Sequence, residues 1–87
     1  MKYIFTQTKA TFLSIVKIQS IHVKTVNLAP LHNDPNMWEH RIMLDDEWIL
    51  GRFENKDRAI KEMRAITEFV MSTETLYEVR KESDVIN

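Results

Sequence analysis

The stretch from residue 38 to residue 70 constrains the fold most, because it has the pattern of a two-stranded hairpin followed by a helix. Large apolar and polar side chains alternate over residues 38–44 and, less strictly, over residues 47–53. A period of two places alternate side chains on opposite faces of a strand. Asp45 and Asp46 separate the two runs, which is the length of a tight hairpin turn. That turn needs positive φ at both positions, which aspartate tolerates, and a longer loop with shorter strands is the alternative.

Residues 55–71 predict the helix that follows the hairpin. The apolar side chains recur at spacings of three and four and comprise Ala59, Met63, Ile66 and Val70, with Ile60 beside them. This spacing forms one buried face of a helix. Asn55 is expected to cap the first turn with its side-chain oxygen. Glu62 and the other charged side chains of the helix are expected on the exposed side.

The chain before the hairpin predicts further short strands, at residues 2–6, 11–13 and 20–26. Residues 14–19 between them suit one tight helical turn, and a single long strand over residues 11–26 is the competing interpretation. Residues 27–37 contain both prolines and are expected to form a long exposed loop.

The elements together predict an α+β fold, in which a small antiparallel β-sheet of four or five strands packs against one C-terminal α-helix. Residues 1–79 are expected to form the single domain that a chain of 87 residues can support. Residues 76–79 fit either a helical turn or an added strand. Residues 80–87 are polar and are expected to fray.

Gly51, the only glycine, lies inside a predicted strand. Glycine weakens strand pairing, so its presence there indicates a bulge or a close approach of another part of the chain. A helix that crosses directly above it is the simplest cause.

Two patterns resemble a group of small, mostly uncharacterised proteins of Gram-positive bacteria and their phages. The matching residues are Phe12-Leu13-Ser14-Ile15 with Ile18, Ile21 and Val23, and then Leu50-Gly51-Arg52-Phe53 with Asn55 and Ala59. The resemblance covers about residues 3 to 70 and implies an antiparallel sheet packed against one C-terminal helix. Val16 departs from it, because an acidic turn residue is usual there, and so does the long loop. The resemblance brings no catalytic residues.

The composition argues against several kinds of chemistry. The chain has no cysteine, which excludes disulfides and thiolate metal sites. Its three histidines lack metal-ligand spacing, and the run Asp45-Asp46-Glu47 lacks the spaced ligands of a calcium loop. One glycine rules out a phosphate-cradling loop. We therefore expect a protein that is not an enzyme and has no catalytic residue, cofactor or metal.

The N-terminal region lacks a continuous apolar segment with a cleavage site, so we expect no signal peptide. No apolar run approaches the roughly 18 residues of a membrane span. We expect a cytoplasmic protein that does not bind membranes.

The charges are unevenly placed along the chain. Five basic and two acidic residues give residues 1–44 a charge of +3, whereas seven basic and eleven acidic residues give residues 45–87 a charge of −4. One alternative function is therefore a nucleic-acid-binding module that uses the basic N-terminal half. Another is a phage-type inhibitor of a host nucleic-acid-binding or defence protein, which would use the acidic half.

Protein binding is the function that the sequence favours. A sheet covered by one helix has a second face, and two tryptophans are hard to bury in so small a core. An exposed aromatic patch is typical of a surface for self-association or for a partner. The candidate interaction residues are Tyr3, Phe5, Trp38, His40 and Trp48. The prediction is a small non-enzymatic protein-binding or regulatory protein, of phage or mobile-element origin, with a homodimer as one form.

Overall fold

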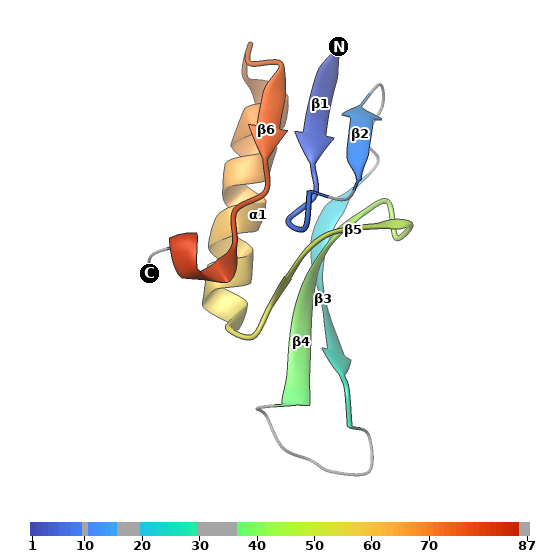
Figure 1. Ribbon diagram of the computed structural model, residues 1–87, viewed down its shortest axis with the longest axis vertical. Helices are drawn as coiled ribbons and strands as arrows, with labels where there is room; N and C mark the ends of the chain where they lie inside the picture. The colour runs from blue at the N-terminus through green and yellow to red at the C-terminus, as the bar shows by residue number, and fades with distance from the viewer. Residues whose placement is uncertain (10, 16–19, 30–36, 86–87) are drawn as a thin grey trace.

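Two three-stranded sheets and one long helix make up the protein (Figure 1). The computed structural model describes residues 1–9, 11–15, 20–29 and 37–85. The elements are β1 (Lys2–Phe5), β2 (Phe12–Ile15), β3 (Ile21–Asn27), β4 (Trp38–Leu44), β5 (Trp48–Phe53), α1 (Lys56–Met71), β6 (Leu76–Glu78) and the short 3-10 helix η2 (Glu82–Asp84). The predicted α+β class is confirmed, but six strands in two sheets replace the four or five predicted in one.

The sheet β3-β4-β5 is antiparallel throughout and contains the predicted hairpin. Asp45 and Asp46 adopt φ angles of 53° and 58°, so both carry the positive φ that the tight turn requires. The N–H of Glu47 donates to the carbonyl of Leu44 at 3.0 Å and closes the turn. Alternation along the sequence therefore placed β4 and β5 correctly.

Gly51 lies beside a β-bulge, as its position inside a strand predicted. The register of β4 against β5 changes from Ile42–Gly51 to Met43–Ile49, which leaves Leu50 as the extra residue. A Cβ atom at Gly51 would lie 3.1 Å from Cγ1 of Val79. The closest neighbour is thus the C-terminal segment rather than the crossing helix that we expected.

The second sheet has the order β2-β1-β6 and mixes strand directions. β2 pairs antiparallel with β1, whereas β6 pairs parallel with it. β2 ends at Ile15 and β3 starts at Ile21 in the other sheet, so the single strand over residues 11–26 is wrong. Of the helical turn predicted at residues 14–19, Ser14 and Ile15 belong to β2 and the rest lies outside the described residues. The open choice for residues 76–79 resolves to a strand at Leu76–Glu78, and Val79 follows it.

Helix α1 begins where the sequence predicted. The side chain of Asn55 accepts a hydrogen bond from the N–H of Arg58 at 3.0 Å. The buried residues of the helix are Ala59, Glu62, Ile66 and Phe69. The buried stripe is therefore rotated from the predicted one, and the placement of Glu62 on the exposed side was wrong.

The hydrophobic core lies between α1, the two sheets and the C-terminal segment. Its most buried members include Ile4 of β1, Ile42 of β4 and Ile66 of α1, each 0% exposed. Val79 and Val85 add to it from beyond α1 and are 3% and 1% exposed. The end of the chain therefore helps to close the core.

Residues 80–85 differ from the frayed tail that the sequence predicted. The Glu82 carboxylate accepts the N–H of Asn55 at 2.7 Å and that of Glu54 at 3.2 Å, so η2 is joined to the start of α1. Residues 86 and 87 lie outside the described residues, as do residues 30–36 of the predicted long loop. On either side of that loop, β3 and β4 pair as far as Asn27 and Trp38. One more hydrogen bond follows, from the Leu28 N–H to the Met37 carbonyl at 2.8 Å.

Within the described part of the chain, no helix is both long and apolar enough to cross a membrane.

Candidate functional site

An exposed aromatic surface lies on the sheet β2-β1-β6. Ile4 enters the core, so its neighbours Tyr3 and Phe5 face the opposite side of the sheet. The Phe12 ring stacks on Tyr3, with centroids 4.9 Å apart and an interplanar angle of 9°, and lies 4.5 Å from the Phe5 ring. Leu76 is opposite Tyr3 in the register of β6. We call Tyr3, Phe5, Phe12 and Leu76 the aromatic face.

Polar groups at the border of the aromatic face are paired within the protein. Glu78 is opposite Phe5 in β6, and its carboxylate lies 3.8 Å from Lys9 Nζ. The hydroxyl of Ser14 lies 2.9 Å from the sulfur of Met1. Phe12 and Leu76 are nonetheless 50% and 49% exposed, so the centre of the face is open to water.

The other predicted interaction residues belong to the sheet β3-β4-β5. Trp38 starts β4 and is 36% exposed, and Trp48 starts β5 and is 43% exposed. His40 is 8% exposed, and its Nδ1 lies 2.9 Å from the hydroxyl oxygen of Thr25. His40 is therefore buried and does not contribute to a surface.

The structure thus brings Tyr3 and Phe5 together and leaves the two tryptophans on a different sheet. Phe12 was missed as a candidate, although it stood in a predicted strand. Only the antiparallel register of β1 and β2, which pairs Phe5 with Phe12, reveals that it completes the cluster.

A buried carboxylate joins α1 to the C-terminal segment. Glu62 is 0% exposed and is surrounded by hydrogen-bond donors. Tyr77 donates its hydroxyl at 3.0 Å, and Arg80 donates its backbone N–H at 2.6 Å and its Nε at 2.7 Å. A second guanidinium nitrogen of Arg80 lies 2.6 Å from the same carboxylate. The buried charge is therefore paired and hydrogen-bonded, which is what makes its burial tolerable.

The pKa values of Tyr77 and Arg80, the two residues that bond to this carboxylate, are both raised. Burial, reinforced by the negative charge of Glu62, raises the pKa of Tyr77 to about 12. The hydrogen bond from Arg80 to Glu62 raises the pKa of the guanidinium above its usual value. Tyr77 therefore stays a neutral donor and Arg80 a cation throughout the physiological range.

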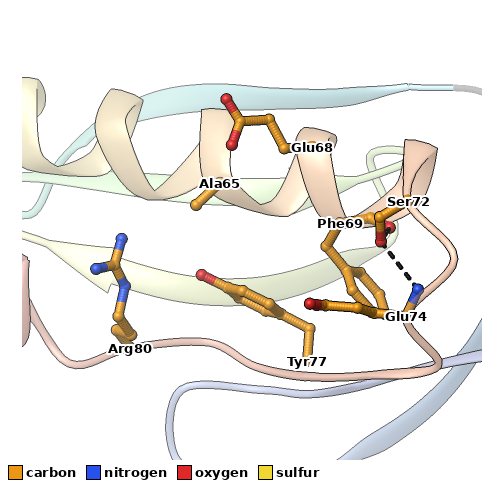
Figure 2. A pocket seen from close by; sticks show the side chains of 7 residues that line it. All are labelled: Ala65, Glu68, Phe69, Ser72, Glu74, Tyr77 and Arg80. Carbon is orange, nitrogen blue, oxygen red and sulfur yellow. Dashed lines mark hydrogen bonds between the residues drawn. The ribbon is translucent and has the colours of Figure 1, made fainter.

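An open groove of about 490 Å³ lies between α1 and the segment that contains β6 (Figure 2). Its lining residues are Ala65, Glu68, Phe69, Ser72, Glu74, Tyr77 and Arg80. Figure 2 shows the Tyr77 and Arg80 side chains pointing from the C-terminal segment toward α1. The Phe69 and Tyr77 rings lie 5.4 Å apart. We call this the α1–β6 groove.

Lys2 holds the end of α1 beside this groove. Its ammonium group donates to the carbonyl of Ser72 at 2.5 Å and to that of Glu74 at 2.6 Å. The same group lies 4.9 Å from the centroid of the Phe69 ring. A cation at the carbonyl end of a helix is favourable, so Lys2 fixes the turn that leads from α1 into β6.

A row of cations crosses the sheet β3-β4-β5. Lys24, Arg41 and Arg52 are directly opposite one another in the strand register, which places them on one face. The Glu39 carboxylate lies 2.6 Å from Arg41 Nε and 3.9 Å from Arg52 Nε. Like charges directly opposite in a sheet repel, and one carboxylate leaves this row with excess positive charge.

In the residues that the structure places, no three histidine, cysteine, aspartate or glutamate side chains are grouped as a metal site. His22 lies 2.8 Å from an Asp46 oxygen at the hairpin tip. Comparison with models of known protein families, with curated proteins and with solved structures finds no match to this chain.

Proposed function

We propose that the protein is a small non-enzymatic binding protein, and that it binds a second copy of itself through the aromatic face. The supporting observation is the half-exposed Phe12 ring packed between the rings of Tyr3 and Phe5. Burying a side chain of this size contributes about 1.5–3 kcal/mol, and interface energy concentrates in such aromatic residues.

The charges around the aromatic face favour a second copy over a charged partner. Its bordering ion pair, Lys9 with Glu78, is internally balanced. Two copies of a balanced, apolar surface approach each other around a two-fold axis without net repulsion.

The size of the face predicts a weak dimer. Three strands about 4.8 Å apart, each three or four residues long at roughly 3.3 Å per residue, make a face of about 10–15 Å on each side. A stable dimer buries about 800 Å² on each partner, which exceeds this face. We therefore expect association that depends on concentration in the micromolar to millimolar range.

Sedimentation equilibrium tests this proposal. The average mass of the wild-type protein should rise from 10.4 kDa toward twice that value as the concentration increases. Phe12→Ser should remain at the monomer mass. Trp48→Ser is the matched control, because it removes an exposed aromatic residue from the other sheet, and it should behave like the wild type. A wild-type mass that stays at 10.4 kDa, or a loss of association in Trp48→Ser alone, would contradict the proposal.

Nucleic-acid binding is a second candidate, which the cation row favours. A phosphate backbone would supply the negative charge that Glu39 only partly provides to Lys24, Arg41 and Arg52. Fluorescence anisotropy with labelled single-stranded DNA and RNA at low salt tests it. The double variant Lys24→Gln/Arg52→Gln should bind more weakly. The slope of log K against log salt concentration should become shallower by roughly one to two. Absence of binding by the wild type at low salt would exclude this candidate.

A further inference from the structure

β6 presents a free edge, because it is an outer strand of the sheet β2-β1-β6. Tyr3 donates its N–H to the Thr75 carbonyl at 2.8 Å, and Val79 donates its N–H to the Phe5 carbonyl at 3.0 Å. In a parallel ladder, successive residues direct their backbone groups to alternate sides. The backbone groups of Leu76 and Glu78 consequently point away from β1.

Helix α1 lies next to β6, on the side of the sheet from which the Tyr77 side chain projects (Figure 1). Arg80 continues the alternation of Leu76 and Glu78, so its backbone groups also point away from β1. Its backbone N–H donates to the buried Glu62 carboxylate of α1 at 2.6 Å. The helix therefore satisfies one backbone group at the end of the edge. The groups of Leu76 and Glu78 come before it along the same edge, next to the α1–β6 groove.

The chemistry of the α1–β6 groove combines aromatic surface with unbalanced negative charge. Phe69 and Tyr77 supply two neighbouring rings. Glu68 and Glu74 are exposed, and no residue that the structure describes bonds to or pairs with either carboxylate. The charge of Arg80 is already matched by Glu62, and Lys2, whose ammonium group bonds to the Ser72 and Glu74 carbonyls, offsets only one of the two carboxylates.

We propose that the α1–β6 groove binds an extended segment of a partner protein, which adds to β6 as a further strand and carries a lysine or arginine side chain into the groove. The backbone groups of Leu76 and Glu78 would pair with the added strand, as in other cases of strand addition. The two carboxylates complement the charge of the basic side chain, and the rings of Phe69 and Tyr77 offer apolar surface to its methylene stem. The groove volume of about 490 Å³ lies in the range of known binding sites.

This site is separate from the aromatic face. Tyr77 points toward α1, whereas Leu76 and Glu78, its neighbours in β6, are opposite Tyr3 and Phe5 on the other side of the sheet. The two surfaces can therefore be tested independently, because Phe12→Ser alters only the aromatic face.

Three labelled peptides of about eight residues, longer than β6 itself, form the probes. The first alternates valine and arginine, so all its arginines lie on one face of an added strand. That face can be directed toward the groove whether the strand runs parallel or antiparallel to β6. The second alternates valine and glutamate. The third is the arginine peptide with every backbone nitrogen methylated, which removes all the N–H donors of an added strand in either orientation but keeps the charges. Binding is measured by fluorescence anisotropy, and the contacted residues are found by amide chemical shifts.

The arginine peptide should bind and should shift the amides of Leu76 and Glu78. The glutamate and methylated peptides should bind at least about tenfold more weakly. Glu68→Gln and Glu74→Gln should each weaken binding of the arginine peptide about three- to fivefold. Two controls should leave the binding of the arginine peptide unchanged. Glu47→Gln removes one charge at the hairpin tip, and Phe12→Ser alters only the aromatic face.

Three results would each overturn the proposal. One is equal binding of the methylated peptide, which would indicate charge attraction without strand addition. Another is equal weakening by Glu47→Gln, which would indicate a response to net charge alone. The third is a set of shifted amides outside α1 and β6.

Discussion

Replacing Arg80 with methionine should destabilise the protein strongly, because the Glu62 carboxylate would stay buried without its cation. The guanidinium supplies two of the four donors to this carboxylate, at 2.7 and 2.6 Å. Breaking a fully buried ion pair from one side costs about 3–5 kcal/mol. The Arg80 side chain is 41% exposed, so water can replace part of the lost interaction, and we expect a cost of about 2–3 kcal/mol. In a domain of this size, that corresponds to a loss of about 10–20 °C in the melting temperature.

Urea unfolding followed by tryptophan fluorescence measures this cost, and Glu62→Gln completes a double-mutant cycle. The glutamine variant should lose about 1–2 kcal/mol, because its amide places N–H donors against the Arg80 guanidinium. The double variant should lose less than the sum of the single variants by at least about 1 kcal/mol, since it has no unpaired charge to bury. Additive losses, or a loss below about 1 kcal/mol for Arg80→Met, would refute the role given to this buried pair.

Substitutions at three further positions test other parts of the structure. Gly51→Ala should cost about 1–2 kcal/mol in urea unfolding, because the new Cβ would lie 3.1 Å from the buried Val79, and an unchanged stability would show that the core yields freely there. Tyr77 has a pKa of 10.0 when unfolded and about 12 when folded, so the stability it provides is complete below pH 10 and is lost as the pH rises through about 12. Wild type should therefore lose about 1–2 kcal/mol more than Tyr77→Phe between pH 9 and pH 12, a figure reduced for partial exposure, and equal losses would contradict the assignment. Glu82→Ala should cost about 1 kcal/mol in thermal unfolding, because the N–H of Asn55 loses its acceptor, whereas Glu82→Gln should recover most of that loss.

Local patterns were sufficient for the parts of the fold that depend on neighbours in the sequence. The alternation of apolar and polar residues predicted β4 and β5. The spacing of apolar residues, together with the Asn55 cap, predicted α1. The turn residues Asp45 and Asp46 adopt the positive φ angles that a two-residue connection demands. In each case the determining interactions lie within a few residues of one another.

The parts that were missed depend on long-range contacts. The parallel pairing of β6 with β1 joins residues more than 70 positions apart, and no local pattern marks it. The sequence placed Glu62 with the exposed charged residues of the helix, but it is buried and its partner is Arg80, 18 residues later. The position of a charged residue on a helix therefore did not reveal whether a distant cation would allow its burial.

The candidate surface was predictable only in part, for the same reason. Tyr3 and Phe5 were chosen for their aromatic character, but Phe12 joins them only through the register of β1 and β2. His40 lies on the same face of β4 as the buried Ile42 and Leu44, so the alternation that placed this strand also indicated its burial. The phage or bacterial origin, the absence of enzymatic activity and the cytoplasmic location stay predictions of the sequence.

Association of two copies through the aromatic face is the central claim, and an isotope-filtered NMR experiment tests it most directly. A concentrated mixture of labelled and unlabelled protein reports only contacts between different copies. The proposal predicts intermolecular contacts between the rings of Tyr3, Phe5 and Phe12 in one copy and the same rings in the other. Intermolecular contacts confined to another surface, or none at concentrations near 1 mM where a weak dimer forms, would contradict it.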